Sequence, residues 1–140
     1  VDIGHTGNST NDIKRQILYG ISDDDLAHHG GELKFGSNGT LILNGDTGIS
    51  AAVKTQLEMI KGEPRIIPIF SSVSGNGNNA NYTIVKFVGI RIMEVKLTGK
   101  MSSKRVIVQP APVTTPYGIL DTGYTSSFTE NIYSPVRIIR

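Results

Sequence analysis

The chain of 140 residues contains no cysteine and no tryptophan. Without cysteine it has no disulfide scaffold, no zinc–thiolate site and no thiol nucleophile. No stretch approaches the roughly 20 consecutive apolar residues that a membrane-spanning helix needs. The net charge is only +2, from 14 basic and 12 acidic residues, so overall charge gives no reason to expect nucleic-acid binding.

Leucine and alanine are scarce beside the β-branched aliphatics: 8 leucines and 5 alanines accompany 18 isoleucines and 10 valines. β-Branched side chains lose rotamer freedom in helices and fit a pleated sheet. The composition therefore predicts an α+β fold dominated by strands. We expect a mixed sheet, or a small and partly open barrel, with two covering helices. No linker rich in Pro, Gly or Ser divides the chain, so residues 1–140 are expected to form one globular domain.

Two segments, residues 10–19 and 49–61, have the apolar spacing of helices. Ser9 can cap the first, and glycines end both. A hairpin is expected over residues 32–44, because the Asn-Gly dipeptide at positions 38 and 39 tolerates positive φ. The remaining expected elements are strands over 65–70, 82–98 (bent near Gly89), 105–109 and 136–139, and a polar loop over 71–81.

Charge is unevenly distributed along the chain. Residues 1–85 carry a net charge of −3, and residues 86–140 carry +5. This asymmetry is typical of internal complementarity, and a docking face is the alternative. The sequence begins at Val1, without methionine or a signal-like segment, so we expect the domain to be cut from a longer protein.

Two Asp-Thr-Gly tripeptides begin at Asp46 and Asp121. Aspartic proteases pair two such carboxylates, so that one activates water while the other acts as the acid. The tripeptide is also common in turns, and Asp46 precedes the expected helix over 49–61, where a carboxylate can act as a cap. We interpret the first copy as a cap or turn and keep an aspartic-type hydrolase as an alternative function.

Two further motifs suggest ligands without the context that a ligand site needs. Residues 75–80 match the G-x-G-x-x-A loop of dinucleotide sites, but such a loop must open a helix, and here a strand pattern follows. His28 and His29 stand near the acidic residues 23–25, yet adjacent side chains point in different directions and a tandem pair rarely chelates one ion. We expect neither a metal site nor a cofactor.

A longer run of residues carries a family resemblance. Residues 44–49, 65–70 and 75–93 contain an Arg–apolar–Pro–apolar strand, a Gly/Asn loop and a Tyr-x-Ile-Val-x-Phe-x-Gly strand. This order resembles the C-terminal globular region of bacterial TadE/TadG-like proteins, which are linked to assembly of tight-adherence (Flp) pili. Segments 95–99, 101–104 and 133–136 also fit this group. The resemblance implies a membrane anchor outside this chain and a periplasmic or cell-surface location, and it brings no catalytic residues.

We therefore expect a non-enzymatic, extracytoplasmic structural or interaction domain of a pilus-assembly or cell-surface protein. The partners implied are proteins of the pilus or secretion machinery, with no nucleic acid and no membrane contact except through a segment outside the chain. A carbohydrate- or peptide-binding module is a further alternative. The residues expected to contact a partner lie in the Asn-rich loop and in the tail: Asn76, Asn78, Asn79, Tyr117, Tyr124, Phe128 and Tyr133.

Overall fold

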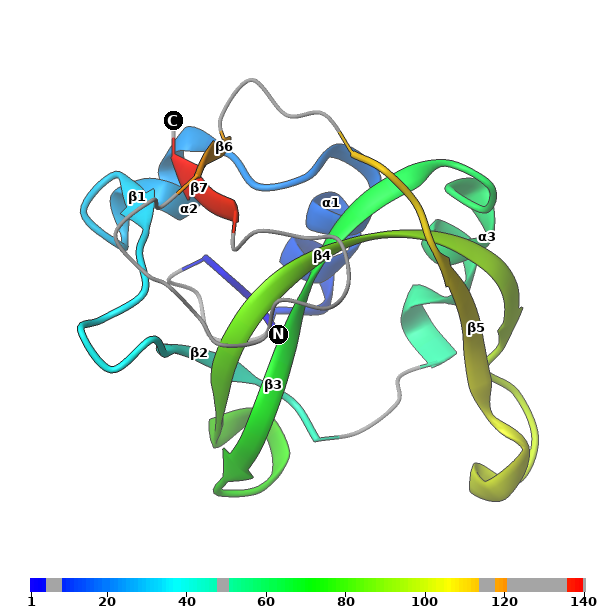
Figure 1. Ribbon diagram of the computed structural model, residues 1–140. Coiled ribbons are helices and arrows are strands. Elements are labelled where there is room, and N and C mark those ends of the chain that lie inside the picture. The colour runs from blue at the N-terminus through cyan, green and yellow to red at the C-terminus, as the bar shows by residue number, and fades with distance from the viewer. Residues whose placement is uncertain (5–8, 48–50, 114–117, 121–135, 140) are drawn as a thin grey trace.

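A computed structural model describes residues 1–4, 9–47, 51–113, 118–120 and 136–139. Its central feature is one long, strongly curved strand, β4 (Ala80–Lys96), around which the other elements are arranged (Figure 1). The helices are α1 (Thr10–Tyr19), α2 (Asp23–Ala27) and α3 (Lys54–Met59). The other strands are β1 (Glu32–Leu33), β2 (Leu41–Gly45), β3 (Pro64–Ser74), β5 (Arg105–Pro110), β6 (Gly118–Leu120) and β7 (Val136–Ile139).

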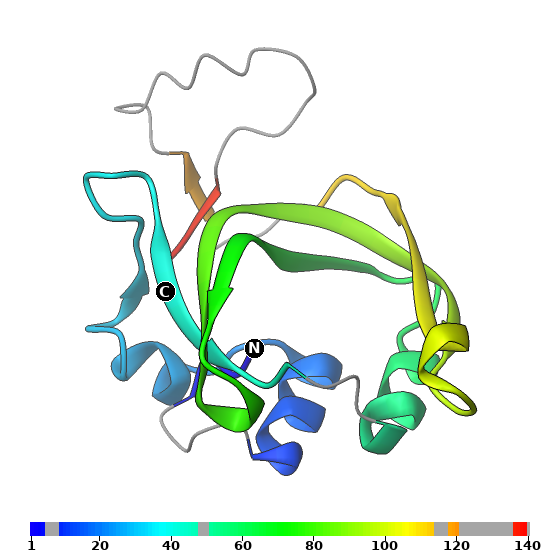
Figure 2. The same ribbon diagram turned by 90° about the horizontal axis from the view of Figure 1, so that it is seen from below.

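The larger sheet is built on β4, which pairs with β2, β3 and β5. Ile90 and Arg91 pair with β3 and with β5, so these two strands lie on opposite sides of β4. Every pairing in the described residues is antiparallel, which corrects the expectation of a mixed sheet. The sheet curls over the helices without closing into a barrel (Figure 2), and the expected α+β class is confirmed.

Two β-bulges shape β4. The pairing with β3 skips Val85, and the pairing with β5 skips Met93. A bulge makes two residues occupy one position of the alternation and bends the strand. Ile84 and Phe87, three residues apart, are therefore both buried, while Val85 is exposed between them. The bulges thus keep apolar side chains turned inward along a strand that bends on either side of Gly89.

Gly89 is required by a close approach between two segments. The backbone N–H of Ala111 donates to the Gly89 carbonyl at 3.0 Å. A Cβ atom at position 89 would collide with the Ala111 carbonyl oxygen and with the Val113 side chain. Only glycine lets the chain that leaves β5 cross β4 here.

The apolar core forms two clusters. The first contains Ile84 and Phe87 from β4, together with residues of the N-terminal segment, α2, β1 and β2: Ile3, Leu26, Leu33 and Leu43. The second contains Ile60 at the end of α3 together with residues of β4 and its continuation, and side chains of α1 and α3 pack against it: Ile60, Ile90, Ile92, Val95 and Leu97. Phe87 belongs to the first cluster and Val88 packs against the second, as the alternation of side chains across a strand requires.

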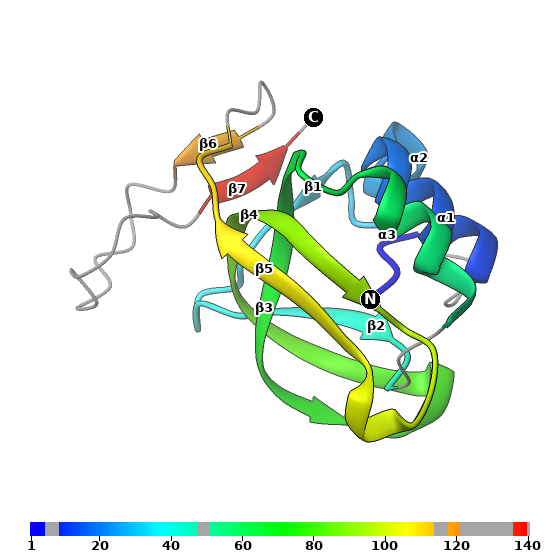
Figure 3. The same cartoon turned by 90° about the vertical axis from the view of Figure 1, so that its right-hand side faces the viewer.

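The expected helices are present with adjusted ends. α1 matches residues 10–19, and Gly20 ends it at a φ of 80°, although the Ser9 side chain makes no capping hydrogen bond. The second helix is shorter than expected: a 3₁₀ turn at Ala51–Val53 leads into α3, and residues 48–50 lie outside the described part. The three helices gather on one side of the molecule, away from β6 and β7 (Figure 3).

The expected hairpin over residues 32–44 is wrong in its pairing. The turn itself forms, because Gly39 has a φ of 72° and the Gly36 N–H donates to the Thr40 carbonyl at 2.8 Å. The strands on either side separate, however: β1 pairs with β7 and β2 pairs with β4. Burial of Leu33 and Leu43 in the first core cluster fixes these pairings, which local turn chemistry does not control.

The strand expectations for 82–98, 105–109 and 136–139 are confirmed, whereas the polar loop over 71–81 is wrong. β3 continues to Ser74, and only residues 75–79 connect it to β4. The extension forms because residues of β4 as far as Asn81 pair with β3. Pro68 lies on β3, an edge strand that pairs only with β4 in the described residues, as expected for a residue without an N–H donor.

Candidate functional site

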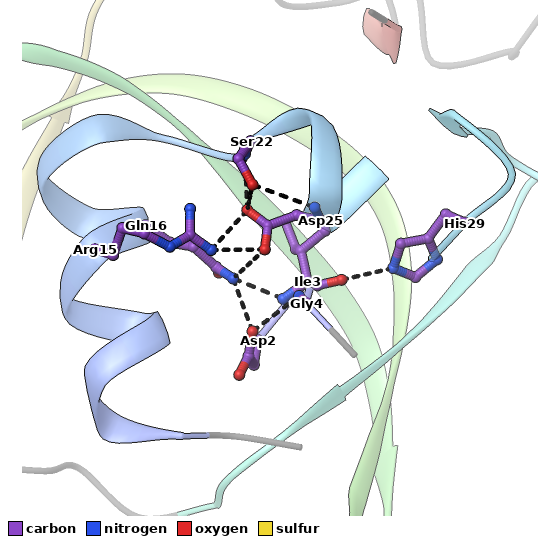
Figure 4. Close-up of polar contacts among 8 residues, drawn as sticks. All are labelled: Asp2, Ile3, Gly4, Arg15, Gln16, Ser22, Asp25 and His29. Atoms are coloured by element: carbon purple, nitrogen blue, oxygen red, sulfur yellow. Dashed lines mark hydrogen bonds and ion pairs between the residues drawn. The ribbon is translucent and has the colours of Figure 1, made fainter. Parts of the chain in front are cut away.

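A buried polar network surrounds Asp25, at the point where α1, α2 and the N-terminal segment meet (Figure 4). Asp25 is 4% exposed. The Nη2 group of Arg15 donates to both of its carboxylate oxygens, at 2.6 and 2.8 Å. Ser22 donates from its backbone N–H at 2.7 Å and from its hydroxyl at 3.0 Å, while its Oγ accepts the Asp25 N–H. This capping box starts α2 and places the carboxylate beside α1.

The same network holds the N-terminal segment. Gln16 Nε2 donates to Asp2 Oδ1 at 2.7 Å, and Gln16 Oε1 accepts the Ile3 N–H at 3.3 Å. His29 Nε2 lies 2.8 Å from the Ile3 carbonyl oxygen. A Cβ at Gly4 would come within 2.9 Å of Asp25 Oδ1, so glycine allows the backbone to pass this close. We name Asp2, Arg15, Gln16, Ser22, Asp25 and His29 the Asp25 network.

The electrostatics of the Asp25 network suit a structural role. Burial acts to raise the pKa of Asp25, but the hydrogen bonds from Arg15 and Ser22 outweigh it, and the pKa lies below its ordinary value. The hydrogen bond to Asp25 raises the pKa of Arg15. Both side chains therefore stay charged near neutral pH and hold each other, and neither is poised to transfer a proton.

The expected contact loop lies at one end of the larger sheet. Gly77 and Thr47 are joined by two hydrogen bonds, in which each backbone N–H donates to the other residue, at 3.2 and 3.3 Å. Asn76 and Asn79 lie in this connection between β3 and β4, and both are exposed. Asn78 belongs to its 3₁₀ turn. As expected, the G-x-G-x-x-A segment leads into a strand rather than a long helix.

Two aromatic rings lie close to this loop. Phe70 and Tyr82 make an edge-to-face contact with ring centroids 5.0 Å apart, and Phe70 is 51% exposed. The Tyr82 hydroxyl donates to the Asp46 carbonyl oxygen at 2.8 Å. This pair was not expected from the sequence, in which the aromatic residues of the tail were the candidates for partner contact. Those residues, Tyr117, Tyr124, Phe128 and Tyr133, lie outside the described part of the chain.

Asp46 is not the N-cap residue of α3. Val53 is the N-cap residue of α3, and that helix begins eight residues after Asp46, at Lys54. Asp46 instead follows β2 and is exposed. Asp121 lies outside the described residues, so the two Asp-Thr-Gly carboxylates are not placed relative to each other.

The two histidines do not converge on one point. Their rings meet edge to face with centroids 5.1 Å apart, and His29 is turned toward the Ile3 carbonyl. Among the described residues no three His, Asp or Glu side chains gather in an arrangement that would hold a metal ion. His29 therefore belongs to the Asp25 network, and the exposed His28 packs against its ring.

The outer edge of β5 is the candidate site that sequence reasoning missed. All six residues of β5 are exposed, and the strand pairs with β4 and with no other strand in the described residues (Figure 1). Val106, Ile107 and Val108 are consecutive aliphatics at 38%, 42% and 43% exposure. We name Arg105–Pro110 with its unpaired side the β5 edge. The signal in the sequence was a short aliphatic run between polar residues, which is indistinguishable from a buried strand.

None of the helices in the described segments is long and apolar enough to cross a bilayer. No family model, curated protein or solved structure matches this chain.

Proposed function

We propose that this chain is a non-enzymatic interaction domain of a pilus-assembly or cell-surface protein, and that it contacts a protein partner through the β5 edge. The observation that carries the proposal is the run of exposed aliphatic residues on a strand edge that pairs with no strand in the described part of the chain. Edge strands of soluble proteins usually display charge, proline or bulges that block pairing, because their free N–H and C=O groups are a template for another strand. On β5 such residues stand only at the two ends, at Arg105 and Pro110.

The extracytoplasmic location rests on the resemblance to TadE/TadG-like proteins. The absence of cysteine agrees with either redox environment. The Asp25 network supports an interaction domain over an enzyme, since its buried carboxylate is engaged by Arg15 and Ser22 and serves to join α1, α2 and the N-terminal segment.

The test places a photo-cross-linking amino acid at position 107 of the full-length gene product, in the cells that make it. Position 34 serves as the matched control, because Lys34 is also exposed and lies outside the β5 edge. We expect one discrete cross-linked protein from position 107, none from position 34, and recovery of the protein in the envelope fraction. Recovery in the cytosol, or equal cross-linking at both positions, would contradict the proposal.

A carbohydrate- or peptide-binding module is the second candidate, favoured by the half-exposed Phe70 ring beside Tyr82 and the loop over 75–79. Sugars stack on exposed aromatic faces and take hydrogen bonds from amide side chains. Phe70→Ala should then abolish retention on a glycan array while leaving cross-linking at position 107 unchanged. Retention that survives this substitution would remove the candidate.

A further inference from the structure

The register of β5 against β4 sorts its side chains onto two faces. Directly opposed residues of an antiparallel pair share one face. Val106 is opposite Val95 and Val108 is opposite Ile92, so both valines share the face that packs against α1 and α3. Ile107 is opposite Glu94 and Arg105 is opposite Lys96, which places these residues on the other face.

The apolar face of β4 continues onto β5, but its side chains become much more exposed there. Ile92 and Val95 are 4% and 7% exposed, whereas their neighbours Val108 and Val106 are 43% and 38% exposed. A strand added alongside β5 would cover both valines, and its own side chains on that face would extend the second core cluster. This geometry selects aliphatic side chains at alternate positions of an incoming segment.

The opposite face and the connection to β4 are basic. Lys96 and Arg105 are directly opposed like charges, an arrangement that is unfavourable without an anion nearby. Glu94 engages Arg105 at 2.6 Å and is the only acidic residue of β4 and β5. Lys96, Lys100 and Lys104 form no ion pair with any described residue. Charge complementarity therefore selects acidic side chains at the remaining positions of the incoming segment.

We infer that the β5 edge binds an extended segment of a partner protein in which aliphatic residues alternate with Asp or Glu. This inference rests on the proposed function and names the chemistry of its partner. The aliphatic side chains lie beside Val106 and Val108. The carboxylates lie on the face that carries Arg105 and, one strand further in, Lys96, at the end of the sheet where the connection to β4 adds Lys100 and Lys104. A second copy of β5 fits this site less well, because it would bring another set of lysines to a face that is already positive.

The experiment titrates the 140-residue chain with fluorescent, N-acetylated and C-amidated heptapeptides. The probe alternates Val with Glu, and the two control peptides carry Lys in place of Glu or N-methyl groups on alternate backbone amides. We expect the Glu peptide to bind about ten-fold or more tightly than the Lys peptide, with an affinity that falls as salt is raised. The N-methylated peptide should not bind. Hydrogen exchange should slow at the β5 amides that point away from β4.

Variants of the chain separate the two halves of the inference. Val106→Lys with Val108→Lys places charges on the apolar side of the edge and should abolish binding. Lys96→Glu should weaken binding of the Glu peptide about ten-fold and strengthen that of the Lys peptide. Lys34→Glu makes the same charge change away from β5 and should leave both affinities unchanged. Thermal unfolding of each variant shows that the fold is retained.

Each of the remaining outcomes overturns one part of the inference or of the proposed function. Equal affinity for the Glu and Lys peptides overturns the charge selection. Dimerisation of the chain in sedimentation that is lost in the Val106→Lys, Val108→Lys variant makes a second copy the occupant. If no peptide binds but position 107 still cross-links to a cellular protein, the partner chemistry is wrong and the proposed function stands. If the Glu peptide binds but the gene product is cytosolic, the proposed function fails alone.

Discussion

The Asp25 network and the β5 edge both carry charged side chains, but in opposite surroundings. In the network, Asp25 is 4% exposed and receives hydrogen bonds from Arg15 and Ser22. At the β5 edge, Val106 to Val108 are at least 38% exposed, and the nearby lysines lack acidic partners among the described residues. The Asp25 carboxylate is thus satisfied within the chain, although the buried Oδ2 of Asp2 in the same network has no hydrogen-bond partner among the described residues. The β5 edge leaves its interactions open.

The two regions differ in the free energy that each arrangement costs the folded state. A buried carboxylate without partners is strongly unfavourable, so the residues around Asp25 must satisfy it for the chain to fold. Exposed aliphatics and solvated lysines cost the folded state little, so their arrangement is free to serve contacts with another molecule. Stability is therefore concentrated around Asp25 and the core, and the proposed interaction at the β5 edge.

The largest expected loss of stability comes from a substitution in the first core cluster. Ile84→Ala removes a side chain that is 1% exposed in the first core cluster, so it should lower the free energy of unfolding by about 2–5 kcal/mol. Urea denaturation followed by circular dichroism measures the loss. A loss below about 1 kcal/mol would show that the first core cluster rearranges to fill the space.

Arg15→Met should be the next most damaging change. It leaves the Asp25 carboxylate buried with Ser22 as its remaining strong donor. We expect a loss of about 2–3 kcal/mol, below the 3–5 kcal/mol of a fully buried pair, because the Arg15 side chain is 35% exposed. Arg15→Lys, measured in the same denaturation assay, should recover part of the loss. Equal stability of the Met variant and the parent chain would contradict the role assigned to the Asp25 network.

The pH dependence of stability tests the same network without changing its packing. The pKa of Asp25 is lowered in the folded chain, so its contribution is fully present above the ordinary Asp pKa of about 3.9 and is lost as pH falls below that value. The stability difference between the parent chain and Asp25→Asn should therefore be constant from neutral pH to about pH 5 and shrink below about pH 4. A stability difference that stays the same below pH 4 would contradict the charged role assigned to Asp25.

The smallest expected effect is at the edge. Ile107→Ala removes the same side chain as Ile84→Ala, but from a residue that is 42% exposed. We expect the free energy of unfolding to fall by no more than about 0.5 kcal/mol, as for ordinary surface substitutions. A loss comparable with that of Ile84→Ala would mean that the β5 edge is part of the core, and the contrast between the two regions would disappear.

The local signals in the sequence succeeded where neighbouring residues decide the outcome. Gly20 ends α1 through a positive φ, and Gly39 supplies the positive φ of a tight turn. The alternating aliphatics of residues 82–97 predicted β4 well, and its bulges explain why both stretches of that pattern face inward. These features depend on backbone sterics and on side-chain periodicity, which act over a few residues.

The same signals failed where distant segments compete for partners. The Asn-Gly turn suggested that the strands beside it pair together, but β2 joins β4 and β1 joins β7. Asp46 was expected to cap the next helix, and the chain instead ends β2 there and begins α3 later. The acidic run at residues 23–25 was considered beside the two histidines as a metal site, and the partnership of Asp25 with Arg15 was not foreseen.

The amino-acid sequence by itself determined the α+β class, the positions of α1 and β4 and the excess of positive charge in the second half of the chain. Only the tertiary structure decided which strands pair, which aspartate is buried and which aliphatic run stays uncovered. The reason is that periodicity reports the two faces of an element, while burial depends on what the remaining chain brings to each face. Val95 and Val106 are residues of the same type on adjacent, paired strands. Their position relative to α1 and α3 alone makes the first a core residue and the second an edge residue.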